Sequence, residues 1–571
     1  MLHGKHYNHK QLKFGDDNMP FLAPIVAGVA AFAATAIGSF LIRLAISFVI
    51  GAVMQNRMKK KMEAMQRANR PSVMVNTASN NEAIPLAYGR TRLGGNRLFT
   101  ESTNGAGNVS INSHLNMLFS ICEGKVNDLE QVWFDNKIVW DINNGGSISS
   151  NELSGFISEF APALNDSETH IVFYDGDDNQ TSNSILQTSI GSQWTSNHRL
   201  RGVVYCGMVL NTNAEIYKGG LPLMTFVVKG KQIRDVSALP STTTYIGSAD
   251  ENPVDVLYDY ITNPRYGKGL DHNSSGVYTP GLNIDLDSFK TARTQAAGYY
   301  KINGVLDTST ELYDNIGEIL ESMNALLVFQ GGKYILKLQR RTESAVATFT
   351  TYDILSPVSV QMPAKSNKFN KVLADYRNKV SGTDYNDDIV IVDSSTYLAE
   401  DNGTELEGRI RLDLVDDVAL ITDIANYTLN TSRYQQTVQF DAAHTALRLQ
   451  CGDIINMDLE EFGWGGPQVE IGNKIFAGNF VIGKTYKIID DGYTQVNPPT
   501  IQTDFTLIGA NNNNEGTVFV ATGVGTGTGT AIEIETNGIP KPFRLTAMSL
   551  NTDNSISITA TEYNGSIQLI P

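Results

Sequence analysis

The feature that most constrains this chain is an apolar stretch from Phe21 to Met54, in which Arg43 is the one charged residue. Within it, Phe21–Ile42 carries no charge and exceeds the run of about 18 apolar residues that indicates a membrane-spanning helix. The rest of the chain is polar, rich in glycine and patterned like β-strands. Because apolar surface is unfavourable in water, any function assigned to the chain must include a place for this segment.

The composition of the stretch predicts helix. Ala30, Ala34 and Gly38 recur every four residues and form a stripe of small side chains, which lets helices approach closely. The stretch is either one helix or a hairpin of two helices, and its apolar part is too long for a signal peptide. A basic amphipathic helix follows and ends at Pro71. Its basic face either meets phosphates or lipid head groups or is solvated.

Length and charge bound the class of protein. The 571 residues imply about three to five domains. The net charge of −16 argues against general nucleic-acid binding, which needs a basic face, but it suits a surface that DNA slides past. The three cysteines, Cys122, Cys206 and Cys451, lie far apart in the sequence. Their number and spacing predict buried free thiols rather than a zinc site or a disulfide scaffold.

From Ser72 the sequence reads as short β-strands joined by turns. Asp135-Asn136-Lys137 separates two apolar runs and predicts a hairpin. The acidic segment Asp175–Asn179 resembles a calcium loop but lacks the downstream glutamate of an EF-hand, so we interpret it as a turn. His3, His6 and His9, spaced every third residue near the N-terminus, are interpreted as part of a mobile tail rather than a metal site.

Residues 252–338 change to a helical period. Asn252 is placed to cap a helix that starts at Pro253 and stops before Pro264. A second helix is predicted from about Asp285, and a third opens with Thr308 and Glu311 at the spacing of a capping box. A hairpin about Gly331-Gly332 follows, because both positions of such a turn need positive φ. These elements predict a small α+β unit.

β patterning returns after residue 367. One more helix is predicted from about Asp416, with an inner face of Val418, Ile421, Ala425 and Leu429. Residues 465–538 form a Gly-rich β insertion, in which the segment DFTLIGA at 504–510 reads as a strand. Its GVGTGTGT run has neither the strand-then-helix context nor the Lys-Ser/Thr end of a P-loop. Two β regions that flank a helical unit suggest a duplicated β-barrel.

Several segments resemble, in chain order, the phage tail tip attachment proteins, the lambda J-like central tail hub family. The first is similar to the family's "PIP-x-x-YGR-x-R-x-GG" opening, and later ones to its "CEG", "P-x-x-x-F-x-x-KG" and "PRYG" segments. The resemblance covers about residues 75–465 and 540–571, and the part from Ala477 to Thr530 resembles a small β module of various phage tail proteins. The segments are Ile84–Gly95, Ile121–Gly124, Leu221–Gly230, Asn252–Gly267, Ile302–Asp307, Gly331–Tyr334 and Gly452–Ile455.

The resemblance implies a mainly β fold with an α+β part, namely two hub β-barrels that flank a small helical domain. It implies a homotrimer in the virion, at the tail tip, whose barrels match a six-fold tube and which closes the DNA channel until ejection. Tail tube proteins, fibre or receptor-binding proteins and phage DNA are the expected partners. The predicted domains are 1–20, a tail; 21–71, the apolar and basic helices; 72–240, the first barrel; 241–345, the α+β domain; 346–465, the second barrel with a helix; 466–539, the inserted module; and 540–571, the last barrel strands.

Two departures from the family pattern matter. The chain stops soon after the hub region, so we expect receptor recognition to belong to separate fibre proteins. The chain itself is expected to be made in the host bacterial cytoplasm. The apolar stretch 21–54 is not part of the shared hub signature. It is predicted to lie in the tail lumen as a plug, to enter the host membrane during DNA passage, or both.

An enzyme, for example a tail-associated cell-wall hydrolase, is the alternative class. The acidic pairs Asp387-Asp388, Asp416-Asp417 and Glu460-Glu461 offer carboxylates. Glycosidase carboxylates must face each other across a substrate, whereas adjacent acids more often lie in solvated turns. No metalloprotease, serine-hydrolase or Cys-His signature is present. We therefore predict no enzyme activity, no catalytic, cofactor-binding or metal-binding residue, and no cofactor.

Overall fold

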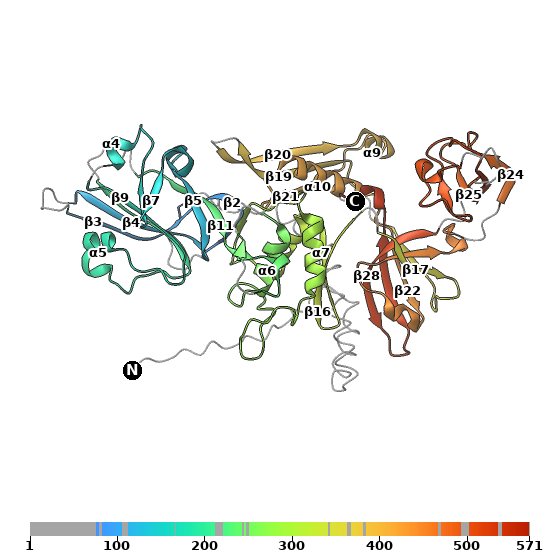
Figure 1. Ribbon diagram of the computed structural model, residues 1–571, viewed down its shortest axis with the longest axis horizontal. Coiled ribbons are helices and arrows are strands. Elements are labelled where there is room, and N and C mark those ends of the chain that lie inside the picture. The colour runs from blue at the N-terminus through green and yellow to red at the C-terminus, as the bar shows by residue number, and fades with distance from the viewer. Residues whose placement is uncertain are drawn as a thin grey trace.

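The computed structural model describes most of the chain from residue 76 onward and shows an elongated molecule, with the first β region at one end and the inserted module at the other (Figure 1). The apolar stretch 21–54, the basic helix after it and the histidine-containing tail lie outside the described residues. Within the described part, no helix combines the length and hydropathy needed to cross a membrane. The described residues are 76–78, 83–104, 112–165, 167–211, 221–241, 245–246, 251–340, 343–362, 367–380, 384–465, 470–492, 502–534 and 540–569.

Two sheets packed face to face form the first β region. Their strand orders are β3-β4-β10-β9-β8-β7 and β2-β11-β5-β6. Alternation along β4 places Met117 and Phe119 in the core between the sheets, and Leu118 on the outer face beside α5. The elements are β2 (Arg90–Gly94), β3 (Asn96–Thr103), β4 (His114–Glu123), β5 (Val126–Phe134), β6 (Lys137–Asp141), β7 (Ser147–Ser149), β8 (Glu152–Ser154), α4 (Ala161–Leu164), β9 (His170–Asp175), α5 (Ser184–Ile190), β10 (Val203–Asn211) and β11 (Met224–Lys231).

The predicted hairpin between β5 and β6 is confirmed, and its turn residue Asp135 has φ of 52°. Two of the predicted buried thiols, Cys122 and Cys206, lie in this region's core. Their burial raises the pKa of Cys122 to about 12 and that of Cys206 further still. Both thiols are therefore protonated and unreactive at neutral pH.

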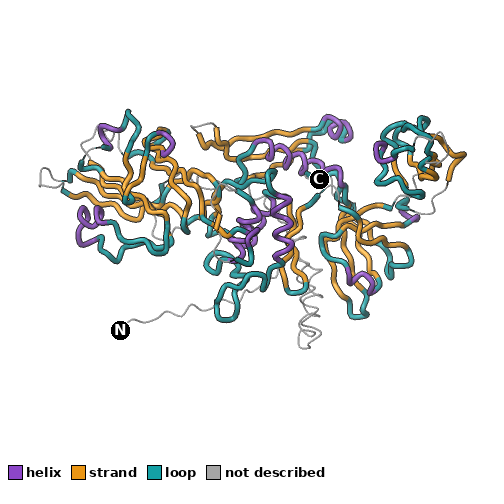
Figure 2. Tube along the Cα trace, viewed as in Figure 1, coloured by secondary structure: helices purple, strands orange, loops and turns teal. Residues whose placement is uncertain are grey.

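The α+β unit packs three helices and a hairpin around one core, seen at the centre of Figure 2. Its hairpin turns at Gly331 and Gly332, with φ of 59° and 85°, as predicted. The elements are β1 (Leu86–Tyr88), β12 (Ile233–Arg234), β13 (Tyr245–Ile246), α6 (Pro253–Thr262), α7 (Leu286–Ala296), β14 (Gly304–Leu306), α8 (Leu312–Glu321), β15 (Ala325–Gln330) and β16 (Lys333–Leu338). β1 pairs with β14 and so ties the start of the described chain to this unit.

Two of the three predicted helix starts in this unit are confirmed. The side chain of Asn252 caps α6 at Val254 N, and the side chain of Asp285 caps α7. The capping box at Thr308 is wrong: Thr308 Oγ1 donates to Ile84 O at 2.9 Å, and α8 begins later, at Leu312. A tertiary hydrogen bond thus replaces the local cap.

A three-stranded sheet backed by α10 joins the same core as the α+β unit. Residues 346–465 therefore contribute to two cores, this one and that of the second β region. In α10, Ile421, Ala425 and Leu429 are buried as predicted, but Val418 is 47% exposed in the first turn, beside the N-cap Asp417. The elements are β19 (Lys371–Val380), β20 (Asp384–Asp393), α9 (Ser395–Glu400), β21 (Glu407–Leu412) and α10 (Val418–Thr431).

The second β region is a six-stranded sheet of order β17-β23-β28-β29-β22-β18, curved around its own core. Cys451 is buried there, and burial raises its pKa to about 11. The elements are β17 (Ala345–Thr350), β18 (Ser359–Gln361), β22 (Thr437–Ala442), β23 (Ile454–Asp458), β28 (Lys541–Leu550) and β29 (Ile556–Glu562).

The two predicted β-barrels are not closed in the described residues. The sheets of both regions are open: β17 and β18 are the edges of one sheet, and β3 and β7 and likewise β2 and β6 are edges in the first region. Alternation in sequence shows which side of a strand is buried, but closure also requires the first and last strands to pair. In the first region, burial comes instead from packing one sheet on another.

The inserted module has a sheet and a core of its own. Its sheet has the order β24-β27-β25-β26, and its core is separate from those of the other regions. The predicted strand DFTLIGA is wrong, because Phe505–Ile508 forms a 3₁₀ turn capped by the side chain of Asp504. The strands are β24 (Glu470–Phe476), β25 (Thr485–Asp490), β26 (Val518–Val520) and β27 (Thr530–Ile534).

Candidate functional site: the junction around Asp259

Motif segments that are far apart in the sequence meet where the first β region joins the α+β unit. We call this place the junction and define it by Tyr88, Glu123, Lys231, Asp259 and Tyr266. Tyr88 lies on β1, Glu123 at the end of β4, Lys231 at the end of β11 and Asp259 on α6, while Tyr266 follows α6. The junction therefore joins four strands or helices and one turn of two structural regions.

The carboxylate of Asp259 is the centre of the junction. Lys231 Nζ donates to its Oδ1 at 2.8 Å and to its Oδ2 at 2.7 Å. The phenol groups of Tyr88 and Tyr266 donate to Oδ2 at 2.7 Å and 3.0 Å. The side chains of Lys231 and Asp259 are 11% and 12% exposed, so this charge pair is largely removed from water and compensated by hydrogen bonds.

The same arrangement keeps both phenols protonated. Burial, and secondarily the negative charge of Asp259, raise the pKa values of Tyr88 and Tyr266 well above the ordinary value of tyrosine. A neutral phenol can donate a hydrogen bond to a carboxylate, whereas a phenolate cannot. Lys231 Nζ also contacts the hydroxyl of Tyr266, which completes a connected polar network.

Backbone contacts bring the strands close enough for this network. Gly89 adopts φ of +64°, and a side chain there would lie 2.2 Å from Asn303 Oδ1 and 2.3 Å from Ile302 O. Asn303 accepts a hydrogen bond from Arg90 N at 2.8 Å and donates to Asp416 at 2.9 Å. The glycine of the "YGR" motif is therefore required both for its left-handed backbone and for close approach.

Two further acidic side chains hold basic residues at the edge of the junction. Glu123 Oε1 lies 3.2 Å from Arg265 Nε, and Glu130 pairs with Arg90 and, at 3.4 Å, with Lys229. Burial raises the pKa of Glu123, although Arg265 and Lys231 act in the opposite direction. Glu123, Arg265, Lys229 and Arg90 belong to the "CEG", "PRYG", "KG" and "YGR" segments, whereas Glu130 on β5 lies outside them. The structure shows which of these residues pair, and the sequence does not.

The chemistry of the junction is structural. Its carboxylate is occupied by an ammonium group and two phenols, which leaves no base directed at a nucleophile. A satisfied polar network of this kind fixes one relative orientation of the elements it joins. Asp259 lies five residues before the proline of the "PRYG" motif, within the matched segment Asn252–Gly267. Only the structure shows which side chains it contacts.

The three predicted acidic pairs occupy separate places. Asp388 lies on β20, Asp417 caps α10, and Glu460-Glu461 begin an exposed 3₁₀ turn. In the Asp175–Asn179 loop, Lys125 Nζ pairs with Asp177 at 2.7 Å and approaches Asp175 at 3.6 Å. Among the described residues no group of three or more His, Cys, Asp or Glu side chains could hold a metal ion.

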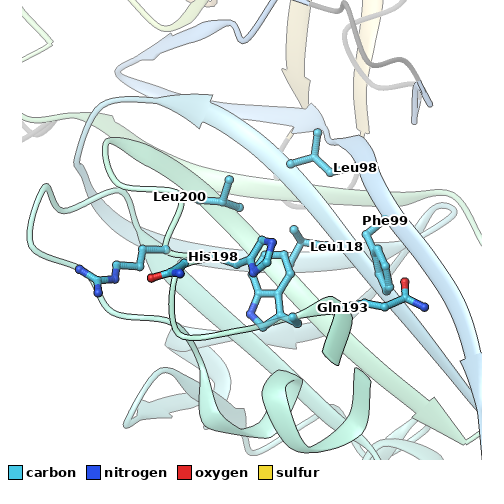
Figure 3. A pocket seen from close by; sticks show the side chains of 9 residues that line it. Leu98, Phe99, Leu118, Gln193, His198 and Leu200 are labelled. Atoms are coloured by element: carbon cyan, nitrogen blue, oxygen red, sulfur yellow. The ribbon is translucent and has the colours of Figure 1, made fainter. Parts of the chain in front are cut away.

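A pocket that sequence reasoning missed lies on the outer face of the first β region (Figure 3). Its volume is about 390 Å³, and its lining includes Leu98, Leu118, Trp194, His198 and Leu200. The rings of Trp194 and His198 stack with 5.0 Å between their centroids. The pocket joins β3 and β4 to the loop after α5, and no local pattern in sequence predicts that pairing.

In comparisons with known proteins, this chain is similar to components of phage tails and of a virion. The sequence is 20% identical to the baseplate hub protein pb3 of Escherichia phage T5 over 289 residues, which are 48% of this chain and 30% of that protein. This chain thus matches less than a third of its relative's length. No protein-family model matches the sequence.

Among solved structures, a chain from the virion of a native gene transfer agent particle shares the fold. The TM-score is 0.51 at 12% identity, and the match covers 97% of this chain and 99% of that one. The 43 kDa tail protein of prophage MuSo2 from Shewanella oneidensis matches with a TM-score of 0.25 and 8% identity over 86% of this chain and 100% of that one, which is too low to argue a shared fold. The sequence relative and the shared fold together support a structural protein of a phage tail or baseplate.

Proposed function

We propose that this chain is the central hub at the distal end of a phage tail, of the tail tip attachment type. The observation that carries the proposal is the shared fold with a virion chain over nearly the full length of both, together with sequence similarity to a baseplate hub protein. In this role three copies surround the axial channel, join the tail tube to the tip and fibres, and close the channel until DNA is ejected.

The charge of the chain fits this role. A net charge of −16 repels the phosphate backbone, so DNA passes such a surface without adhering. The junction supports the role in a second way: a ring of subunits transmits force only if the domains of each subunit hold one orientation, and the network around Asp259 fixes two of them.

Two measurements test the proposal. Light scattering on the purified chain is expected to give three times the chain mass of 62.4 kDa. Electron microscopy of tails with this chain tagged is expected to place the tag on the three-fold axis at the distal end. A tag distributed along the tube, or absent from the tail, contradicts the hub role.

The role needs no catalysis. Incubating the purified chain with bacterial cell walls is expected to release no muropeptides. Release above the level of a heat-inactivated sample would support a cell-wall hydrolase instead, and the acidic pairs named above would be the first residues to substitute.

A second candidate function rests on the sequence of residues 21–54. Their uncharged length and stripe of small residues fit a segment that leaves the tail lumen and enters the host membrane. The test compares liposome leakage caused by the full chain with that of a chain starting near Pro71. Equal leakage, or none from either, removes the membrane role and leaves a segment that packs against its copies.

A further inference from the structure

The inserted module ends in an apolar surface that its own core does not use. Leu507 is 79% exposed, Ile482 64% and Phe476 58%. Phe476 ends β24, Ile482 lies in the loop after it and Leu507 lies on a 3₁₀ turn, while Val481, Val520 and Val524 are also exposed, by 53%, 42% and 50%. Large apolar side chains gathered on one surface of a small domain indicate an interaction site.

Hydrogen bonds show that these loops lie together at one end of the module. Gly478 N donates to Val524 O at 2.7 Å, Gly483 N to Ala521 O at 2.8 Å and Thr522 N to Ile508 O at 2.9 Å. Residues 476–483, 505–514 and 516–525 contain no charged side chain. We call this end of the module the apolar tip.

The turn that carries Leu507 is firmly built. Phe505 and Ile508 are buried in the module core, and the carboxylate of Asp504 accepts hydrogen bonds from Thr506 N and from Asn513 Nδ2. Leu507 points away from that core, with an exposed acidic residue three positions before it. Among the exposed apolar side chains of the tip, Leu507 is thus held on a hydrogen-bonded turn, next to the negative charge of Asp504.

The pocket of Figure 3 has the complementary character. Leu98, Leu118 and Leu200 surround His198, giving apolar walls to a cavity of about 390 Å³. The segment 191–202 beside it contains Arg199 and Arg201 and no acidic residue. Arg199 is itself part of the lining.

Trp194, which lines the pocket, also has a hydrogen-bond donor without a partner. The residue is 6% exposed, and its indole Nε1 is buried without a hydrogen-bond partner among the described residues. Buried donors of this kind are costly, so this side of the pocket is not fully satisfied in the single chain.

The inserted module and the region of the pocket differ in charge. The module, residues 470–534, contains six acidic residues and three lysines. The module and the first β region, which carries the pocket, lie at opposite ends of the elongated molecule (Figure 1), so a contact between the tip and the pocket would have to join two copies. The acidic module with its apolar tip is complementary to a pocket that combines leucine side chains with Arg199, although Glu101 accepts a hydrogen bond from the lining residue Gln193 at 2.8 Å.

We propose that the Leu507 turn of one copy docks in the pocket formed by Leu98, Leu118, Trp194 and Leu200 of a second copy. The contact is head-to-tail, and because the two surfaces differ, successive contacts close into a ring when the rotation between copies permits. The inference rests on the proposed homotrimer and deepens it, since it names the surfaces by which neighbouring copies recognise each other.

Cross-linking between copies tests the contact directly. Leu98→Cys and Leu507→Cys chains that carry different affinity tags are co-expressed and mildly oxidised, so a disulfide between the two positions joins two copies. The three native cysteines are buried and have raised pKa values, so they stay unreactive. We expect a covalent dimer that carries both tags, and none when Val277→Cys, at a position 57% exposed in the α+β unit, replaces Leu507→Cys.

A second measurement uses the assembled full chain. Leu507→Asp is expected to raise the dissociation constant between copies at least tenfold, because it places a charge in an apolar pocket. Val277→Asp, at a matched exposed aliphatic position, is expected to leave it within twofold. Both side chains are exposed in the single chain, so the circular dichroism spectrum of each variant should equal that of the wild type and show that the chain is folded.

The outcomes separate the two proposals. Trimers that form no cross-link between positions 98 and 507, or whose dissociation constant is unchanged by Leu507→Asp, overturn this contact and leave the trimeric hub intact. Wild-type chains that remain monomeric at every concentration overturn the trimer and the contact with it.

Discussion

The junction and the inserted module are held together in opposite ways. The junction draws side chains from β1, β4, β11 and α6, and one of its hydrogen bonds joins Tyr88 to Asp259, 171 positions further along the chain. Among the described residues, the strands of the module pair with one another and enclose a core of their own. Glu470 on β24 is the register partner of Ile534 on β27, so the two ends of the module lie side by side.

This difference indicates how far the destabilising effect of a substitution should spread through the molecule. A defect in the junction reaches two regions at once, because its polar groups have no alternative partners once buried. A defect in the module stays local, since insertions whose ends lie close together add little constraint to the host. We therefore expect substitutions at the junction to have the largest effects and changes to the module the smallest.

Asp259→Ala is expected to be the most damaging substitution. It leaves the ammonium group of Lys231 buried without its carboxylate and removes the acceptor of two phenols. Removal of one partner of a buried ion pair costs about 3–5 kcal/mol of unfolding free energy. Urea unfolding followed by circular dichroism measures it.

Lys137→Ala is the matched control. Lys137 Nζ pairs with Glu159 at 2.6 Å, but the two side chains are 64% and 61% exposed. Exposed pairs contribute about 0–1 kcal/mol. If both substitutions cost the same, the network around Asp259 has no special role in joining the two regions.

Gly89→Ala is expected to cost about 3 kcal/mol or more, from left-handed backbone strain and from a clash with Ile302 and Asn303. Gly276→Ala separates the two causes, because Gly276 has φ of +76° but open space around it. Backbone strain alone predicts about 1–2 kcal/mol there. Equal losses in melting experiments would show that close approach at the junction is unimportant.

Glu123→Gln tests the electrostatics of the junction by its pH dependence. The folded pKa of Glu123 is raised by burial, so the folded state holds the proton more tightly than the unfolded state. Its contribution to stability therefore falls as pH rises from the unfolded pKa through the folded pKa, and stays reduced above that window.

The variant carries no such penalty. Relative to the wild type, Glu123→Gln is expected to gain stability between about pH 4 and pH 7, by less than about 1 kcal/mol. Thermal unfolding of both proteins at the two pH values measures the difference. A relative loss over that range would mean that the attraction of Arg265 outweighs the burial of Glu123.

Replacement of residues 470–534 by a short Gly-Ser linker is expected to have the smallest effect on the body of the molecule. The adjacent ends of β24 and β27 allow the chain to reconnect without strain. We expect the melting temperature of the remaining protein to change by less than about 2 °C. A large decrease would mean that the module supports the second β region.

Local signals in the sequence predicted the elements well where their partners are near in the chain. The cap of α6 at Asn252 and the turn at Gly331-Gly332 follow from residues within a few positions of each other. The same reasoning failed at Thr308, whose hydroxyl bonds to Ile84 O, 224 positions away. It failed again at Phe505–Ile508, where a capping aspartate and a 3₁₀ turn replaced a strand.

The two candidate sites, the junction and the pocket, also differ in how much of each the sequence indicated. The motif segments contain Gly89, Glu123, Asp259 and Tyr266, but Lys231, the charge partner of Asp259, lies just beyond the segment Leu221–Gly230. The pocket around Trp194 was not visible, because its walls come from β3, β4 and a loop that have no shared pattern. Likewise, alternation indicated buried strands but not that the sheets stay open.

The sequence by itself determined the order of the regions, the β character of most of them, the helical unit from residue 252 and the self-contained insertion, because these depend on local periodicity and turn residues. Only the tertiary structure decided that Tyr88, Lys231 and Tyr266 share one carboxylate, and that the inserted module and the first β region lie at opposite ends of the molecule. The physical reason is that long-range pairing is chosen by the packing of whole faces, which no short stretch of sequence encodes.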